Sequence, residues 1–296
     1  MLQVGGLAQL VVAGLTVGSG YALVALGIHI ILRATRVINF AQGEFVVLGG
    51  LIAYTCVTRL SANAFVALAL ATLAGFLLGL CYERFVLRPA ARVGDLAVTI
   101  ATIGTVSILL YGHALIWGSL PAPLPPFSGT AASTVELAGA SIQVQSLWVL
   151  ALLALALCAL YAFFERTTFG KAIRAAANSP TGAQLVGIDV GTTRMMSVGI
   201  SIALAAFGGT IIGPITLVGG AGGVAIAIKG FVGAVVGGLD SPVGCALGGL
   251  VVGVVEKLLE GAFSYGIADP IVYSLLLVAL LVRPQGLLGR RAALRD

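Results

Sequence analysis

Amide and carboxylate side chains are concentrated in one short window of an otherwise apolar chain. The stretch RVINFAQGEF, residues 36–45, carries Asn39, Gln42 and Glu44 and lies between two apolar blocks. Two interpretations fit it: a turn at a membrane surface with Glu44 in the first turn of the next helix, or a segment that penetrates the protein interior. In the interior its amides would contact a solute or a neighbouring helix. Buried polar groups at membrane depth are costly and usually serve a pathway, which favours the second interpretation.

The longest basic loop, FGKAIRAAANSPTGAQLVGIDVGTTRM, carries signals for a very short helix. Ser179 is a suitable N-cap, Pro180 suits the first helical position, and Gly187 can close the turn at the far end. These signals predict a helix from about Pro180 to Val186 that exposes Leu185 and Val186. Such a helix is typical of a surface that a membrane protein presents to a soluble partner, although an amphipathic loop on lipid headgroups is the alternative.

Isolated charges occur in the glycine-rich stretch near the C-terminus. Lys229 either lines a pathway or extends its ammonium group to the membrane surface. Glu256 and Glu260 share one helix face near a predicted membrane edge, where we expect a solvated helix end rather than a proton relay. His29 and His113 stand alone in apolar runs, and we expect them to serve packing or helix contacts.

Motifs for catalysis and metal binding are missing from the sequence. Gly170-Lys171 is followed by Ala172, so no GxxxxGK[ST] nucleotide-binding loop is present, and neither HExxH nor GxSxG occurs. The four cysteines lie singly in apolar runs, without the spacing of a metal site. We therefore expect neither enzymatic activity nor a metal centre, and the net charge of +5 forms no basic face for nucleic acid.

Composition places these residues in a membrane protein. Only 9% of the 296 residues are charged, 59% are hydrophobic, and the mean hydropathy is +1.11, whereas soluble proteins carry roughly 25% charged residues. A transmembrane helix needs about 20 predominantly apolar residues. The sequence predicts an all-α polytopic membrane protein, a single transmembrane domain over residues 1–296, with about eight spans. These lie near 7–32, 44–60, 62–82, 96–118, 146–164, 195–218, 230–255 and 262–282.

The basic residues predict which loops face the cytoplasm. Thirteen of the sixteen lie in the stretches 33–44, 83–95 and 165–194 or after residue 282. Because cytoplasmic loops are enriched in Lys and Arg, we expect these four stretches inside the cell and the N-terminus outside. The loop at 119–145 then faces the exterior.

This orientation requires an even number of crossings between the loop at 165–194 and the C-terminal tail, yet three apolar segments lie there. The sequence VVGGLDSPVG offers a break, because Gly237-Gly238 can end one helix and Asp240-Ser241-Pro242 can begin another. We therefore expect the segment at 230–255 to consist of two pieces, or one segment nearby to enter and leave on the same side.

Glycine is abundant, with 41 residues, and often recurs at four-residue spacing. Small residues at this spacing let membrane helices approach closely. We expect packing grooves within the chain, and a face for homodimerisation is the weaker alternative. The pairs are Gly14/Gly18, Gly75/Gly79, Gly209/Gly213, Gly233/Gly237, Gly244/Gly248 and Gly249/Gly253.

Several stretches together resemble a known family. They are GYALVALGIHIILRATRVINFAQGEFVVLGG, ERFVLRPAAR, IATIGTVSILL, GKAIRAAANSPTGAQLVGIDV, KGFVGAVVGGLDSPVGCALGGLVVGVVE and LVRPQGLLG, in this order over nearly the whole chain. They look like the membrane-spanning permease subunit of bacterial ABC importers for branched-chain amino acids and related solutes. The segment NFAQGE resembles the shorter of the two permease types that such importers pair.

The resemblance implies a complex in the bacterial inner membrane. It would contain a second related permease, two cytoplasmic ATPases that bind ATP and magnesium, and an external substrate-binding protein that meets the loop at 119–145. No cofactor would be bound by this chain itself. The resemblance leaves the solute open, because family members also serve urea, short amides and carboxylates.

The resemblance also implies roles for particular residues. Asn39, Gln42 and Gly43 would lie at the translocation pathway, and we add Glu44 and Lys229 as further pathway candidates. The cytoplasmic loop at 165–194 would dock on the ATPases. Its expected contact residues are Gly170, Lys171, Arg174, Asn178 and the short helix from Pro180 to Gly187.

Two other functions remain open from the residues themselves. A secondary transporter would need coupling-ion sites built from intramembrane carboxylates or histidines, whereas the carboxylates here lie at predicted span edges, apart from Asp240 at the break. A passive channel for small neutral solutes would suit the glycine-rich breaks but would leave the long basic loop without a role.

Overall fold

The computed structural model describes residues 4–118, 120, 122–130, 132–137, 140–216, 219, 222–263, 265–283 and 285–289. The helices are α1 (Val4–Thr35), α2 (Gln42–Leu60), α3 (Ala64–Tyr82), the π-helical turn η1 (Glu83–Leu87), α4 (Arg88–Ala91), α5 (Asp95–Trp117), α6 (Val144–Arg166), α7 (Thr168–Asn178), α8 (Pro180–Leu185), α9 (Val190–Thr216), α10 (Gly222–Gly237), α11 (Pro242–Ala262) and α12 (Tyr265–Val282). A hairpin of β1 (Thr134–Leu137) and β2 (Ala140–Gln143) pairs antiparallel.

The all-α polytopic fold predicted from composition is confirmed, with the small hairpin as an addition. Within the described residues, seven helices are long and apolar enough to cross a membrane, and α10 is a shorter apolar helix. Predicted spans correspond to α1, α2, α3, α5, α6, α9 and α12, and the remaining one, at 230–255, is divided. Residues 64–91 form one continuous run, since α3 passes through η1 into α4.

The break in the segment at 230–255 is confirmed in its two-piece form. Helix α10 ends at Gly237, Gly238 has a φ of +110°, and Pro242 opens α11 with the Ser241 side chain accepting a hydrogen bond from the Gly244 amide. His29 Nδ1 lies 2.6 Å from the carbonyl oxygen of Leu239, so this histidine contacts the turn between the two helices rather than a helix.

The predicted start of that segment, at residue 230, was wrong. Helix α10 begins at Gly222 and includes Lys229, because the charge that marked a span edge in the sequence is buried and paired inside the protein.

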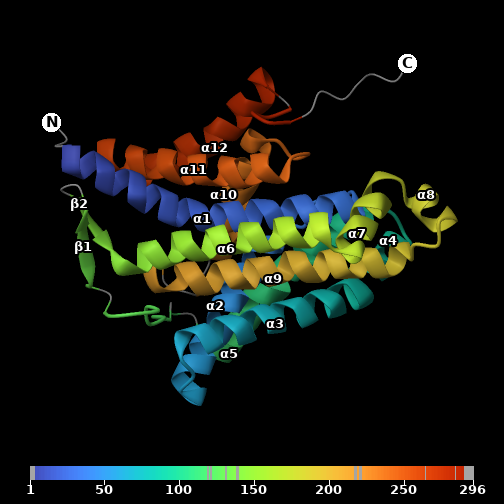
Figure 1. Ribbon diagram of the computed structural model, residues 1–296, viewed down its shortest axis with the longest axis horizontal. Helices are drawn as coiled ribbons and strands as arrows, with labels where there is room; N and C mark the ends of the chain where they lie inside the picture. Colours follow the sequence, from blue (N-terminus) through green and yellow to red (C-terminus); the bar gives the residue numbers. More distant parts are fainter. Residues whose placement is uncertain are drawn as a thin grey trace.

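The long helices run along the long axis of the molecule (Figure 1). The N-terminal end of α1 and the β1–β2 hairpin lie at one end, and α4, α7 and α8 lie at the other. Helix α1 packs against α9, α10 and α11, and α9 packs in turn against α2 and α3. The buried core therefore centres on α1 and α9.

Close glycine contacts explain this packing and confirm the predicted grooves. A Cβ atom on Gly18 of α1 would lie 2.9 Å from the Leu250 carbonyl oxygen of α11. A Cβ atom on Gly79 of α3 would lie 2.7 Å from the Gly199 Cα atom of α9. Since both glycines face neighbouring helices of the same chain, their spacing serves internal packing.

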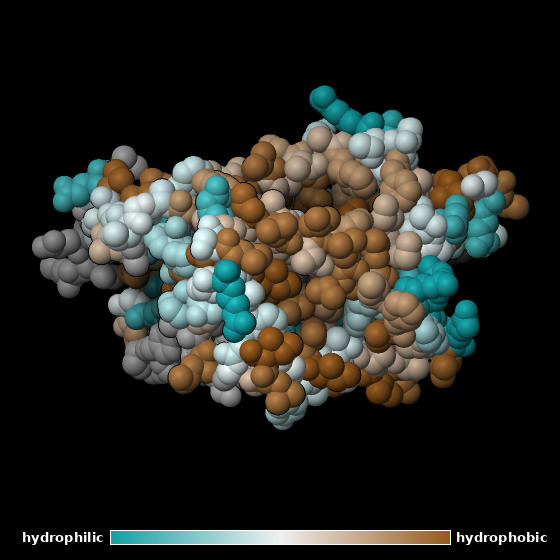
Figure 2. Space-filling view, turned by 90° about the horizontal axis from the view of Figure 1, so that it is seen from below, coloured by the Kyte–Doolittle hydropathy of each residue, from teal (hydrophilic) through white to brown (hydrophobic). Residues whose placement is uncertain are grey.

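Large apolar side chains cover the outside of α3, α5 and α6. Leu77, Ile108, Leu115 and Leu155 are all exposed, which is expected where lipid is the solvent. Figure 2 shows hydrophobic side chains dominating the middle of one face, with hydrophilic ones gathered toward the two ends of the long axis. The molecule is therefore a multi-pass membrane protein.

Candidate functional site

The polar window of residues 36–45 lies inside the protein. Arg36, with a φ of +60°, follows the end of α1, and the chain turns back so that α2 begins at Gln42. Asn39, Gln42 and Glu44 are each at most 2% exposed. The interior position is confirmed, and the alternative of a surface turn is wrong. The segment lies in the interior because the side-chain amides of Asn39 and Gln42 bind groups within the protein.

The Gln42 side chain joins three helices. Its Nε2 donates to the Ser201 carbonyl oxygen at 3.0 Å, and Ser201 Oγ donates to the Gly27 carbonyl oxygen at 2.8 Å. Gly27 and Ser201 lie within α1 and α9, so α2 begins well inside the helical bundle. Asn39 Nδ2 donates to Gln42 Oε1 at 3.2 Å, and Tyr82 OH donates to Asn39 Oδ1 at 3.4 Å. These amides therefore meet neighbouring helices.

Glu44 and His113 form a buried pair with spare hydrogen-bonding capacity. His113 Nδ1 lies 3.5 Å from Glu44 Oε2, and neither the carboxylate oxygens nor the ring nitrogens make a hydrogen bond within the described residues. The Glu44 carboxylate packs against Gly223, and Gly43 also packs against the Gly223 backbone. Helices α2 and α10 thus begin next to each other within the protein, with a titratable pair at the junction.

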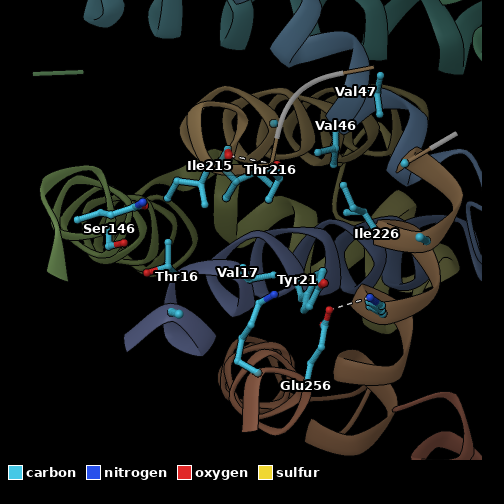
Figure 3. Close-up of a pocket in the computed structure, with 18 of the residues that line it drawn as sticks. Thr16, Val17, Tyr21, Val46, Val47, Ser146, Ile215, Thr216, Ile226 and Glu256 are labelled. Carbon is cyan, nitrogen blue, oxygen red and sulfur yellow. Dashed lines mark hydrogen bonds and ion pairs between the residues drawn. The ribbon is translucent and has the colours of Figure 1, made fainter. Parts of the chain in front are cut away.

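A cavity of about 620 Å³ lies beside this junction (Figure 3). Most of its lining comes from α1, α2, α9, α10 and α11, while Gln143 of β2 and Ser146 of α6 line it near the hairpin. Lys229 lines the cavity. Asn39, Gln42, Gly43 and Glu44 do not belong to its lining, which instead contains other residues of α2. The lining includes Thr16, Val17, Tyr21, Val46, Val47, Ile212, Ile215, Thr216, Ile226, Glu256 and Lys257.

Lys229 is held by two carboxylates within the protein. It is 6% exposed, and its Nζ lies 2.8 Å from Glu256 Oε1 on α11 and 2.7 Å from Asp269 Oδ1 on α12. The membrane-surface interpretation of Lys229 is therefore wrong. The expectation of a solvated end at Glu256 is also wrong, because Glu256 is 3% exposed and its charge is compensated by Lys229. Glu260 pairs with Lys257 at 2.6 Å.

The basic loop at 165–194 lies at the end of the molecule opposite the hairpin (Figure 1). The predicted short helix is confirmed as α8, with Ser179 Oγ accepting a hydrogen bond from the Gly182 amide at 3.1 Å. Leu185 is 84% exposed, Val186 is also exposed, and Gly187 has a φ of +82°. Helix α8 and the following Val186 and Gly187 therefore form an exposed tip, which is apolar at Leu185 and Val186.

Helix α7 precedes this tip and was not predicted. Thr167 caps it by accepting a hydrogen bond from the Gly170 amide at 2.9 Å, and Gly170 packs against the backbone of α6. Lys171 and Arg174 lie on its exposed side, and Arg174 pairs with Glu165 of α6. The Asn178 side chain accepts a hydrogen bond from Arg33 at 2.8 Å. Helix α7 therefore connects the tip to α1 and α6.

A buried ion cluster beside this loop was also missed. Glu83 is fully buried, its Oε2 lies 3.2 Å from Arg88 Nη2, and its Oε1 lies 3.3 Å from Arg194 Nε. Arg88 Nη2 also donates to the Gly191 carbonyl oxygen at 3.2 Å. The cluster thus connects η1 and α4 to the first turn of α9. The sequence indicated this cluster only indirectly, because its charged residues lie in the stretches 83–95 and 165–194, which are both predicted to face the cytoplasm.

Asp189 forms the cap between the tip and α9. Its carboxylate accepts hydrogen bonds from Thr192 Oγ1 at 2.5 Å and from the Gly191 amide at 2.8 Å. The Thr192 hydroxyl and these backbone contacts hold the pKa of Asp189 below its usual value. The cap is therefore charged at neutral pH.

Comparison with known proteins places these features in one family. The family described as "Branched-chain amino acid transport system / permease component" matches residues 10–282. The "High-affinity branched-chain amino acid transport system permease protein BraD" of Pseudomonas aeruginosa is 32% identical over 296 residues, covering 95% of each chain. The corresponding LivH protein of Salmonella typhimurium is 32% identical and covers 94% of each.

An archaeal protein is similar over almost the same length. The "Probable branched-chain amino acid transport permease protein LivH" of Methanocaldococcus jannaschii is 30% identical over 283 residues, which cover 90% of this chain and 88% of that protein. No solved structure matches the chain.

Proposed function

Because the chain belongs to the permease-component family of branched-chain amino acid transport systems, we propose that it is the membrane-spanning subunit of an ATP-driven importer. Its solutes are branched-chain amino acids or related small polar molecules, and its membrane is the bacterial inner membrane. The cavity of about 620 Å³ lined mainly by membrane helices carries the proposal, since it gives a solute a place within the span.

The exposed tip is the docking site for the ATPases in this proposal. Gly170, Lys171, Arg174 and Asn178 of α7 and the helix from Pro180 to Gly187 form the contact surface. Two ATPase subunits bind there and carry ATP and magnesium, while a second related permease completes the membrane part. The apolar Leu185 and Val186 at the tip support this role, because exposed apolar patches at a polar end mark interaction sites.

The opposite end receives the solute from an external binding protein in this proposal. The N-terminus of α1 and the hairpin face the exterior, and the basic stretches at 33–44, 83–95 and 165–194 face the cytoplasm. The tail is also cytoplasmic, although residues 290–296 lie outside the described residues. Movement of the tip on ATP binding passes through the Glu83 cluster and α9 to the cavity. The translocation pathway of the solute is bordered by Asn39, Gln42, Gly43, Glu44 and Lys229.

A secondary transporter is the second candidate, because the structure brings ionisable groups into the protein interior. Glu44 with His113, and Lys229 with Glu256, are the pairs that such a transporter would use to bind a coupling ion. The two functions differ in their energy source, which an uptake experiment separates.

The test is purification of the tagged chain from its native membranes, followed by reconstitution. We expect two ATPase subunits and a second polytopic subunit to copurify, and vesicles with external binding protein to take up labelled L-leucine only with ATP inside. A proton ionophore is the control. Uptake that is abolished by the ionophore and needs no ATP would replace the importer with the secondary transporter.

A further inference from the structure

We propose, on the basis of the importer function above, that the cavity contains a subsite for the ammonium group of a zwitterionic aliphatic amino acid. Glu256 supplies the carboxylate oxygen that accepts this ammonium group, and Lys229 and Asp269 position Glu256 and set the local charge. Figure 3 shows Glu256 extending from α11 toward Tyr21 at the cavity wall.

The charges of the cluster do not balance without a ligand. Lys229 is one cation between two carboxylates, those of Glu256 and Asp269. Lys257 does not compensate the difference, since Glu260 already pairs with it. The cluster therefore carries one excess negative charge beside the cavity.

One oxygen atom of this cluster lacks a partner. Lys229 occupies Glu256 Oε1, and the Tyr21 hydroxyl faces the same carboxylate, whereas Glu256 Oε2 is buried and accepts no hydrogen bond of ordinary geometry within the described residues. A buried acceptor without a partner is costly, and more so when it is charged. Because Glu256 lines the cavity, a ligand with N–H donors and a positive charge would satisfy this oxygen.

A metal ion fits the cluster poorly. Within the described residues no group of three or more His, Cys, Asp or Glu side chains could hold a metal ion. The Lys229 ammonium group already lies between the two carboxylates and would repel a metal. An organic ammonium group needs only hydrogen-bond acceptors and space, and the cavity provides both.

The rest of the lining suits the remainder of an aliphatic amino acid. Val17, Val46, Val47 and Ile226 give the cavity an apolar wall for a branched side chain. Donors for a ligand carboxylate occur on the same lining at the Ser146 hydroxyl and at the Lys257 ammonium group, which has further N–H groups besides the one that pairs with Glu260. Urea and simple amides lack the positive charge, and carboxylates without an amino group bring only the repelled negative charge. The subsite therefore selects amino acids among the solutes that the family resemblance leaves open.

The test measures thermal unfolding of the purified transporter complex in detergent, without binding protein or ATP. L-Leucine is compared with 3-methylbutylamine, which keeps the ammonium group, and with 4-methylpentanoate, which keeps only the carboxylate. A ligand that binds the folded state raises the unfolding temperature with its concentration. We expect L-leucine and the amine to raise it, and the carboxylate to leave it unchanged.

Three variants assign the effect to the cluster. Glu256→Gln keeps the shape but loses the charge, so we expect the half-saturating L-leucine concentration to rise about tenfold or more. Asp269→Asn, at a partly exposed position, tests the same charge if Glu256→Gln does not fold, and should weaken L-leucine binding in the same direction. Glu165→Gln, on α6 and outside the cavity lining, is the control and should bind as the wild type does.

Equal stabilisation by the amine and the carboxylate, or unchanged binding of L-leucine to Glu256→Gln or Asp269→Asn, would overturn the subsite. This readout is independent of transport. If L-leucine binds through Glu256 while ATP fails to drive uptake, the importer function is wrong and the subsite stands.

Discussion

Glu83 is a buried carboxylate that pairs with two arginines from separate stretches of the chain. Replacing it with glutamine leaves Arg88 and Arg194 without their buried counter-charge. Breaking a buried ion pair costs about 3–5 kcal/mol. Because both guanidinium groups keep partial access to solvent, we expect Glu83→Gln to lower the unfolding free energy by about 3 kcal/mol. Thermal unfolding in detergent measures the change.

Glu165 provides the matched control for Glu83. It also pairs with an arginine, Arg174, but both side chains are 44% exposed. An exposed ion pair contributes about 0–1 kcal/mol, so Glu165→Gln should unfold close to the wild-type temperature. Equal losses in the two variants would show that burial of Glu83 does not govern the stability of the cluster.

The contact between α3 and α9 depends on the absence of a side chain at Gly79. A valine there would place Cβ 2.7 Å from the Gly199 Cα atom, and backbone on both sides cannot yield without separating the helices. Overpacking typically costs about 1–3 kcal/mol, so we expect Gly79→Val to lower the unfolding temperature. Gly104→Val on α5 is the control, since a Cβ there meets no atom within 4 Å. Similar losses in both variants would refute a close-packed α3–α9 contact.

The turn after α8 requires a backbone conformation that proline cannot adopt. Gly187 has a φ of +82°, and its amide donates to the Gln184 carbonyl oxygen at 3.0 Å, whereas proline fixes φ near −65° and has no N–H. We expect Gly187→Pro to displace the tip, so that ATPase activity continues while ATP-driven uptake falls, with insertion unchanged.

Arg174→Glu tests the same segment by a different route, because it replaces an ion pair with Glu165 by repulsion. Both variants are assayed for ATPase activity and uptake in the same reconstituted vesicles. If both transport normally, the assignment of this segment to the ATPases is wrong.

Local signals predicted the elements that are decided locally. The break between α10 and α11 followed from Gly237-Gly238 and Ser241-Pro242, and α8 followed from the cap at Ser179. Helix α7 was missed although it has an equally local cap at Thr167, because Ser179, Pro180 and Gly187 mark only the helix that follows it. The start of α10 could not be placed, since Lys229 looks like a span edge until its partners are known.

The sequence predicted which residues belong to the candidate site, but it did not predict which residues they contact. The polar window around Gln42 was conspicuous in an apolar sequence, yet its contact with Ser201 joins residues 159 positions apart. Lys229 and Glu256 are 27 positions apart on different helices, and no periodicity connects them. Such pairs depend on how helices pack, which glycine spacing suggests only in outline.

The two ends of the molecule's long axis carry different structures, which the membrane helices separate. The hairpin lies at one end, near Gln143 and Ser146 of the cavity lining, while the α7–α8 tip and the Glu83 cluster lie at the other. Helices α1 and α9 form the core between them. A displacement of the tip can therefore reach the cavity through packed helices, as alternating access requires.

This polarity predicts the orientation of the chain in the membrane. Thirteen of sixteen basic residues lie in the four stretches assigned to the cytoplasm, and the enrichment of cytoplasmic loops in Lys and Arg then places α8 inside the cell and the hairpin outside. Single cysteines at Leu185 and Val135, both exposed, report on the two ends. The native Cys56, Cys81, Cys158 and Cys245 are first replaced with alanine.

A membrane-impermeant maleimide should label Val135→Cys in right-side-out vesicles and Leu185→Cys only in inside-out vesicles. Uptake of L-leucine by both variants is the control for correct assembly. The reverse labelling pattern would show that the chain has the opposite orientation in the membrane. It would place the α8 tip where no ATP is available, so the docking surface for the ATPases would have to be sought at the hairpin end instead.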